Sequence, residues 1–223
     1  MPVTDPPEHE LVLERLEAAH GRGSRPRRDP VDELILTILS QNTTDENRDR
    51  AWSALREAYP VWESVRRADP ATLEAAIRPA GLGRQKAAAI QAALERIERD
   101  RGRISLDHLE GMNDRKALDY LTDVRGVGTK TAACVLCFAL RRPVLPVDTH
   151  VRRLATRLGW VQAGSSAERT HEILNGTVPG ALRFRLHLAL IAHGRATCAA
   201  RRPACGACVL AGACPKIGVG AGG

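Results

Sequence analysis

The chain has 223 residues and a formal net charge of +7, and 43% of its residues are hydrophobic while only 3% are aromatic. This length allows one large domain or two small ones, with a core of aliphatic side chains. No apolar run reaches the ~20 residues needed to cross a bilayer, and the acidic, proline-containing start is not typical of a signal peptide. We therefore expect a cytoplasmic protein without a membrane segment, and its basic charge indicates a polyanionic partner.

Helical patterns dominate the chain. Apolar side chains share one face in residues 10–20, and a long helix is expected over residues 84–100, after the Gly81-Leu82-Gly83 turn. The last helix is expected over residues 181–193. Capping patterns predict five further helix starts: Asp29-Pro30, Thr43-x-x-Glu46, Asp69-Pro70, Asn113 and Ser165-x-x-Glu168. Because no stretch alternates polar and apolar residues with a period of two, we predict an all-α fold.

Four cysteines near the C-terminus are spaced Cys198-x6-Cys205-x2-Cys208-x5-Cys214. Four thiolates in one short segment can hold a metal centre, and zinc modules usually bring two close pairs together. A single tight pair with wider steps on either side better suits a cubane iron–sulfur cluster. A disulfide knot is the alternative, but nothing else in the chain is typical of a secreted protein.

Gly126-Val127-Gly128 interrupts two helical stretches. Two glycines one residue apart allow a hairpin whose backbone N–H groups, at the start of the second helix, can bind a DNA phosphate. The pattern is equally compatible with a simple corner between two helices.

Lys130 lies in the first turn of the helix expected after this hairpin. The helix dipole disfavours a cation there, and a free amine is a nucleophile that can form a Schiff base. The alternative is that Lys130 only contacts a phosphate. Asp148 is expected to be the N-cap of a later helix, where a fixed carboxylate near the amine could stabilise a cationic transition state.

Three motifs in this order resemble the endonuclease III family of helix-hairpin-helix DNA glycosylases, which carry a [4Fe-4S] cluster. They are Gly-Val-Gly-x-Lys-Thr-Ala at 126–132, Val-Asp-Thr-His at 147–150 and the cysteine quartet. The resemblance spans about residues 30–214. It implies that Lys130 is the nucleophile that attacks C1′ of a damaged nucleotide, that Asp148 is the catalytic aspartate, and that Cys198, Cys205, Cys208 and Cys214 are the cluster ligands.

The resemblance also implies a set of DNA contacts. Leu82 matches an apolar wedge that enters the duplex, and Asn42 takes the place of an inserting glutamine, with Gln41 beside it; which amide fills the gap stays open. Phosphate contacts are expected independently of the resemblance, from the hairpin backbone at Gly126, Gly128 and Thr129 and, because of the basic net charge, from Arg201 and Arg202 in the first loop between the cysteines. For the two arginines the alternative is solvated surface charge. Gly83 and Arg125 depart from the family, which commonly has a tyrosine and a proline at these positions.

We expect two helical domains. Residues 30–142 would form a six-helix barrel ending in the hairpin, and residues 1–29 with 143–223 would form the cluster domain, with the DNA groove between them. Cys134 and Cys137 are expected to be buried apolar thiols rather than a second metal pair.

The implied function is bifunctional. A DNA glycosylase/AP lyase would excise oxidised pyrimidines from double-stranded DNA in base excision repair, as a nucleoid-associated monomer. The alternatives are an adenine or mismatch glycosylase of the same superfamily and a non-catalytic, zinc-stabilised DNA-binding module.

Overall fold

The computed structural model describes residues 5–220, and every regular element in this range is helical, as the sequence predicts. The chain divides into two compact units. We call residues 27–142 the hairpin domain, and residues up to 26 together with those from 143 onward the cysteine domain. Residues 1–4 and 221–223, which belong to the expected cluster domain, lie outside the described residues.

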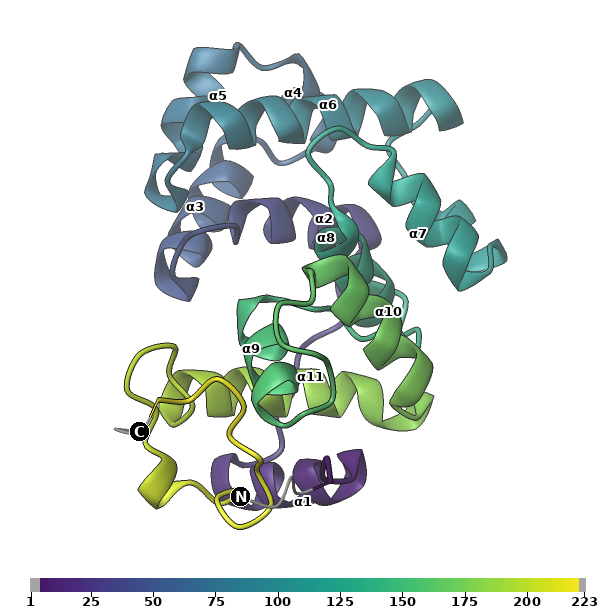
Figure 1. Cartoon of the computed structure of the whole chain (residues 1–223). Helices are drawn as coiled ribbons and strands as arrows, with labels where there is room; N and C mark the ends of the chain where they lie inside the picture. Colours follow the sequence, from purple (N-terminus) through teal and green to yellow (C-terminus); the bar gives the residue numbers. More distant parts are fainter. Residues whose placement is uncertain (1–4, 221–223) are drawn as a thin grey trace. The chain divides into compact units, whose positions relative to one another are not determined.

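The hairpin domain is built around one buried helix. Seven α-helices make it up: α2 (Pro30–Leu39), α3 (Asp45–Ala58), α4 (Trp62–Arg67), α5 (Pro70–Ile77), α6 (Gly83–Arg101), α7 (Asp114–Thr122) and α8 (Thr129–Cys134). Short 3₁₀ turns, Arg78–Ala80 and Asp107–Gly111, lie before α6 and before α7. Nearly every residue of α2 is buried, because α3, α6 and α8 all pack against it (Figure 1).

The capping predictions are mostly confirmed. Asp29, Asp69 and Asn113 are N-caps whose side chains accept backbone N–H bonds. Two predicted caps are wrong by one residue. Thr44, not Thr43, caps α3 by accepting from the Asn47 backbone, and Ser166, not Ser165, caps α10 (Ala167–Thr177). In both pairs adjacent hydroxyl residues offer the same chemistry, so the pattern alone does not distinguish them.

The helix after the hairpin is not regular throughout. Its α-helical part ends at Cys134 and is followed by a π-helical turn, Val135–Ala139. Cys134 and Cys137 are buried in this segment, as predicted. A π-turn accommodates one extra residue and shifts the face that the following residues present.

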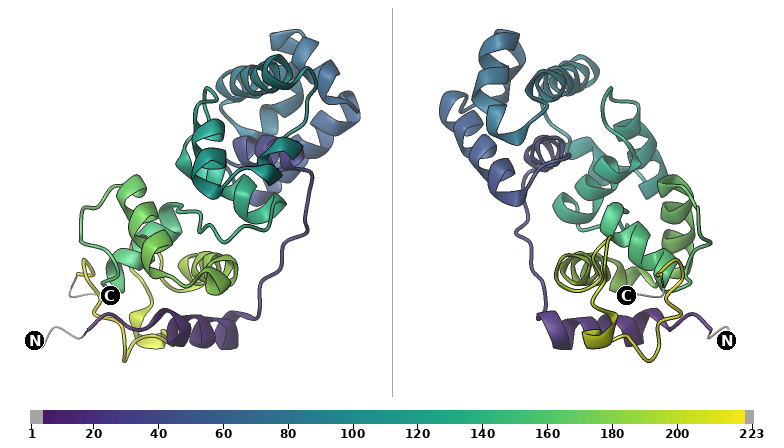
Figure 2. Two further views of the ribbon diagram at one scale, coloured as in Figure 1. Left: turned by 90° about the vertical axis from the view of Figure 1, so that its right-hand side faces the viewer. Right: turned by 60° about the vertical axis from the view of Figure 1, so that its left-hand side comes forward.

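The cysteine domain consists of α1 (His9–His20), α9 (Thr149–Arg157), α10 (Ala167–Thr177), α11 (Gly180–Ala196) and a 3₁₀ turn, Cys205–Ala207. The long helix α11 packs against both α1 and α9. Gly194 allows the close approach of α9, since a Cβ at this position would lie 2.8 Å from Nδ1 of His150. Extended segments without regular structure follow α1 and precede α9 (Figure 2). None of the described helices is long and apolar enough to cross a bilayer.

Candidate nucleic-acid interface and active site

The hairpin between α7 and α8 is held by its own backbone. Val124 N–H donates to the Leu121 carbonyl at 3.2 Å, and Val127 N–H donates to the Val124 carbonyl at 3.0 Å. Gly126 has φ of +84°, and a Cβ there would lie only 2.9 Å from Cβ of Ala89 on α6. Gly126 is therefore required both by its conformation and by its packing.

The second glycine has a different role from the first. Gly128 is the N-cap of α8 with φ of −91°, and no atom lies within 4 Å of the place where its Cβ would be. Any residue can adopt this backbone conformation, so only Gly126 is sterically required in the hairpin.

Lys130 lies in the first turn of α8 and is half-buried. Within residues 5–220 its amine forms no hydrogen bond or ion pair. The next residue, Thr131, is buried, and its hydroxyl accepts a hydrogen bond from Nε2 of Gln41 at 3.4 Å. Gln41 therefore contacts the helix that carries the predicted nucleophile.

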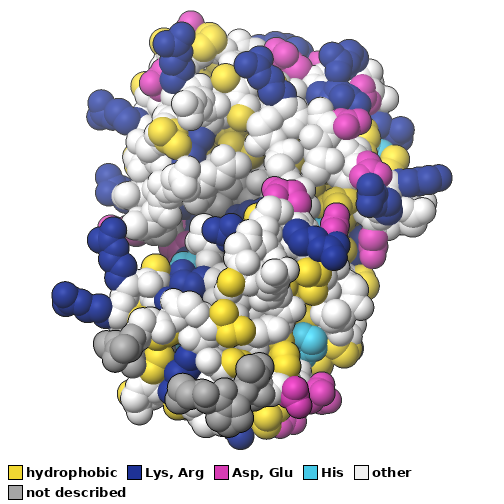
Figure 3. Space-filling model, in the orientation of Figure 1, with side chains coloured by type: hydrophobic (Ala, Val, Ile, Leu, Met, Phe, Trp, Pro, Cys, Tyr) yellow, Lys and Arg dark blue, Asp and Glu magenta, His cyan; other side chains and the backbone are white. Residues whose placement is uncertain are grey.

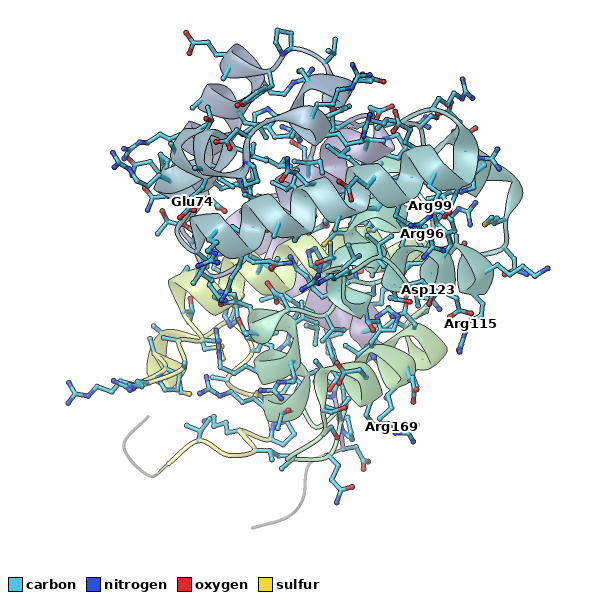
Figure 4. The ribbon with its side chains drawn as sticks, turned by 90° about the horizontal axis from the view of Figure 1, so that it is seen from above. Glu74, Arg96, Arg99, Arg115, Asp123 and Arg169 are labelled. Carbon is cyan, nitrogen blue, oxygen red and sulfur yellow. The ribbon has the colours of Figure 1, made fainter. Side chains whose placement is uncertain are left out.

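Two exposed tips of the hairpin domain have left-handed backbones without being glycine. Asn42, between α2 and α3, has φ of 50° and is exposed, and Leu82, before α6, has φ of 51° and is 49% exposed. A left-handed conformation costs a residue with a Cβ about 1–2 kcal/mol, and least for Asn. Gly83, next to Leu82, lets its loop pack on α5: a Cβ there would lie 3.0 Å from Cγ of Glu74 (Figure 4).

Basic side chains are spread over the face shown in Figure 3, with acidic side chains among them. The arginines of the molecule include some that form ion pairs and some that do not. On α6 and α7, Arg96 and Arg115 (Figure 4) pair with Asp100 and Asp119. Such pairs on exposed helix faces are typical of solvated surface charge.

A second group has no acidic partner. Arg84 and Arg125 line an open hollow of about 480 Å³ between α6 and the hairpin, with Gln85, Ala88, Ala89 and Gly126. No ion pair is formed by either residue, or by the exposed Arg201 and Arg202, in the described part of the chain. These four arginines remain available to an external anion.

In the cysteine domain, Asp148 is the N-cap of α9, as predicted: its Oδ1 accepts from the Val151 N–H at 2.8 Å. The extended segment before it is held by side chains instead of a neighbouring strand. Asn175 accepts from the Leu145 N–H at 2.8 Å and donates to the Leu145 carbonyl at 3.0 Å. A ring nitrogen of His187 lies 2.9 Å from the Pro146 carbonyl. Backbone polar groups that lack a sheet partner are thus satisfied, and the position of Asp148 within its domain is fixed.

Two arginines of α9 hold the loop between Cys198 and Cys205 by hydrogen bonds to its backbone carbonyls. Arg157, which is 8% exposed, donates to the carbonyls of Ala199 at 2.7 Å and Ala200 at 3.0 Å. Arg153 donates to the carbonyls of Cys198 at 3.0 Å and Gly194 at 2.8 Å. These contacts support the segment from which Arg201 and Arg202 project.

The four cysteines line one cavity together with Arg157 and His193. The Arg157 guanidinium lies 3.1 Å from Sγ of Cys198, and Nε2 of His193 lies 3.4 Å from Sγ of Cys208. Burial raises the pKa of Cys208 and of Cys214, and the neighbouring cysteines raise both further. Burial, followed by the nearby His20 ring, lowers the pKa of His193 to about 4.

A single metal ion and a metal cluster place different demands on the side chains that bind them. Throughout residues 5–220, no three His, Cys, Asp or Glu side chains come together in an arrangement that would hold one metal ion. Four thiols that line one cavity are a ligand set that an iron–sulfur cluster can take.

Sequence reasoning missed the residues that support these sites. Arg153 and Arg157 are four positions apart on α9 and so share one face of the helix, a spacing that was visible in the sequence. Their partners lie more than 40 residues away in the chain. Lys86 was missed as well; it lies four positions before Ile90 on the buried face of α6, and this spacing was visible in the sequence.

Comparisons with known proteins agree with this arrangement. The model of the HhH-GPD superfamily of base excision DNA repair proteins matches residues 35–179. Endonuclease III of Sulfolobus acidocaldarius is 37% identical over 183 residues, which are 81% of this chain and 79% of the relative. A candidate DNA glycosylase of Arabidopsis thaliana is 39% identical over 165 residues, 74% of this chain, and the match spans 56% of that protein.

A solved structure extends the match to three dimensions. The structure of a trapped endonuclease III–DNA covalent intermediate has a TM-score of 0.80 and 28% identity, and covers 92% of this chain and 93% of that chain. The chain belongs to the endonuclease III family, within the HhH-GPD superfamily of base excision DNA repair proteins.

Proposed function

We propose that this protein is a DNA glycosylase and AP lyase that removes oxidised pyrimidines from double-stranded DNA, acting as a cytoplasmic, nucleoid-associated monomer. The observation that carries the proposal is Lys130, a half-buried residue directly after the hairpin, whose amine has no partner in the described residues. The related endonuclease III that was trapped as a covalent intermediate with DNA supports a reaction through an enzyme–DNA bond.

In the proposed reaction the Lys130 amine attacks C1′ of the damaged nucleotide, and the base leaves with the bonding electron pair. The amine proton passes to the departing base, and the sugar ring opens as the C1′–O4′ bond breaks, which leaves a protonated imine between Lys130 and C1′. This imine makes the C2′ proton acidic. Loss of that proton and departure of the 3′ phosphate cut the strand on the 3′ side of the lesion by β-elimination. The Asp148 carboxylate, of which only Oδ1 is used as a helix cap, stabilises the positive charge that develops on the sugar.

The proposed cofactor is a [4Fe-4S] cluster held by Cys198, Cys205, Cys208 and Cys214. When bound, it supplies a fourfold covalent cross-link for the loop region rather than a reacting centre. Arg157 and Arg153 hold the same loop through its carbonyls and balance the thiolate charge.

The proposed DNA contacts fall into two classes. Backbone N–H groups of Gly126, Gly128 and Thr129, with Arg201 and Arg202, bind phosphates in a way that does not depend on sequence. Gln41, Asn42 and Leu82 belong to the loops that fill the gap when the damaged nucleotide leaves the stack. The unpaired arginines of the hollow, Arg84 and Arg125, add positive charge beside the hairpin.

Borohydride trapping tests the central step. Incubation with a duplex that contains thymine glycol and with one that contains an abasic site, in the presence of borohydride, is expected to link the protein covalently to DNA. The chain contains lysine at only four positions, 86, 116, 130 and 216, so peptide mapping can identify the attacking residue. We expect the adduct on Lys130.

Variants complete this test. Lys130→Gln is expected to lose trapping and strand cleavage by about a thousandfold or more while still binding DNA. Lys116→Gln, which changes an exposed lysine of α7, is the matched control and keeps both. An adduct that persists in Lys130→Gln would contradict the proposed lyase. Release of adenine from a mispaired duplex without cleavage would favour the alternative adenine glycosylase.

A further inference from the structure

One buried lysine joins the bases of the two exposed tips of the hairpin domain. Lys86, on α6, is 2% exposed, and its Nζ donates to the carbonyls of Leu39 and Ala80, both at 2.8 Å. Leu39 is the last residue of α2, three positions before Asn42, and Ala80 lies two positions before Leu82. A single ammonium group therefore connects the starts of both loops.

The same residue also holds one tip through its backbone. The Lys86 N–H donates to the Leu82 carbonyl at 3.0 Å, which fixes the left-handed residue at the start of α6. Residues with a Cβ keep a left-handed backbone only where their surroundings determine it. The hydrogen bond from the Lys86 N–H is the first i→i−4 bond of α6 and is made by the main chain, whereas the Nζ bond to Ala80, two positions before Leu82, depends on the lysine side chain.

The positive charge of Lys86 is stabilised by the carbonyl groups that surround it. Its two acceptors are helix-terminal carbonyls, where the dipole of α2 is negative, and burial lowers its pKa without any carboxylate among the causes. Because Nζ bonds to two backbone carbonyls and not to a flexible acidic side chain, Lys86 holds the main chain of both loops directly.

The neighbouring contacts decide which amide forms the first tip. Nε2 of Gln41 is bonded to Thr131 within the domain, whereas Asn42 is exposed and forms no hydrogen bond through its side chain in the described residues. The left-handed turn at Asn42 directs the chain away from α2 before α3 begins at Asp45. Asn42 rather than Gln41 is then the residue free to enter DNA.

We propose that Lys86 is a positioning residue that fixes the spacing of Asn42 and Leu82, so that the two tips enter the DNA duplex together. This inference rests on the proposed function, because it assumes that the loops fill the gap left by a displaced nucleotide. Lys86 itself does not touch DNA; it acts through Leu39 and Ala80.

Fluorescence of 2-aminopurine tests the inference without any chemical step. The probe is placed opposite a tetrahydrofuran abasic analogue in a duplex, where insertion of the tips unstacks it and raises its emission. At saturating protein we expect strong brightening with the unmodified chain and with the matched control Lys116→Met. Lys86→Met is expected to lose most of the brightening although it retains helical circular dichroism and binds the duplex within about threefold of the control, since phosphate contacts dominate affinity.

A double-mutant cycle on Asn42 and Leu82 tests the inference even if Lys86→Met does not fold. Asn42→Ala and Leu82→Ala remove side chains that are exposed. If the tips act together, each single variant loses most of the brightening and the double variant loses little more; independent, additive losses would overturn the inference. Unchanged brightening in a folded Lys86→Met would do the same.

The two proposals fail separately. If the unmodified chain is trapped by borohydride but does not brighten the probe, the proposed reaction stands and the coupled tips are wrong. Brightening without trapping would contradict the proposed lyase and leave the tips intact.

Discussion

The hairpin at residues 123–128 and the cysteine loop at residues 199–204 carry comparable proposed tasks but are held in different ways. In the hairpin, backbone groups bond to one another, and Gly126 packs on Ala89. In the cysteine loop, the carbonyls of Ala199 and Ala200 depend on the Arg157 side chain, and the flanking thiols surround a cavity. The hairpin is held by its own backbone, whereas the cysteine loop is held by a side chain from α9 and, in the proposed holoprotein, by the cluster between its flanking thiols.

Loss of one proposed cluster ligand is expected to have the largest effect, and to affect the cysteine loop but not the hairpin. Cys198→Ser should abolish iron binding and the brown colour and remove the cooperative unfolding of the cysteine domain, since structural metal centres contribute on the order of 10 kcal/mol. The hairpin domain should keep its helical circular dichroism. The control Cys134→Ala, in a buried thiol of α8, should retain iron and colour. A colourless wild-type protein that contains zinc would contradict the cluster.

Substitution of the two hairpin glycines should have a smaller effect, limited to the hairpin domain. Gly126→Ala is expected to lower the free energy of unfolding by about 1–3 kcal/mol, because of its left-handed φ and its contact with Ala89. Gly128→Ala should cost only about 0.5 kcal/mol, as an alanine N-cap in open space. Urea unfolding midpoints measure the difference, and equal losses for both would show that the hairpin is not fixed as described.

The smallest expected effect is a pH dependence in the cysteine domain. Burial lowers the pKa of His171, so this ring stays neutral in the folded state while the unfolded chain takes up a proton as pH falls below about 6.5. The contribution of His171 to stability is therefore present above that pH and decreases on acidification, by no more than about 1.4 kcal/mol per pH unit. His171→Gln should flatten the slope of unfolding free energy between pH 7 and pH 5. An unchanged slope would mean that the ring is protonated in the folded state.

Local features were predictable from the sequence, and the long-range contacts were not. Asp29, Asp69, Asn113 and Asp148 were identified as caps because the bond of each is made within three residues. The short helix α4 was missed, since its N-cap, Val61, offers no side-chain bond.

The contacts of the supporting side chains could not be predicted from the sequence, for a physical reason. Lys86 and Arg157 are polar residues that each bond to a distant carbonyl, 47 and 42 positions away respectively, and nothing in the local pattern marks those carbonyls. The exposed tip at Leu82 was predictable because a leucine between two glycines has little local core to join. The role of Gln41 required its contact with Thr131, 90 residues away.

The discontinuity of the cysteine domain has a consequence for the synthesis of the protein. Helix α1 packs against α11, and its residues Glu17 and His20 bond to Arg185 and His193, 168 and 173 positions later. The hairpin domain lies entirely between these partners in the chain. A chain that emerges from the ribosome can therefore complete the hairpin domain while α1 still lacks its partner, because domains fold as units in the order in which they are made. Closure of the cysteine domain, and with it the proposed binding of a cluster, then follows completion of the hairpin domain.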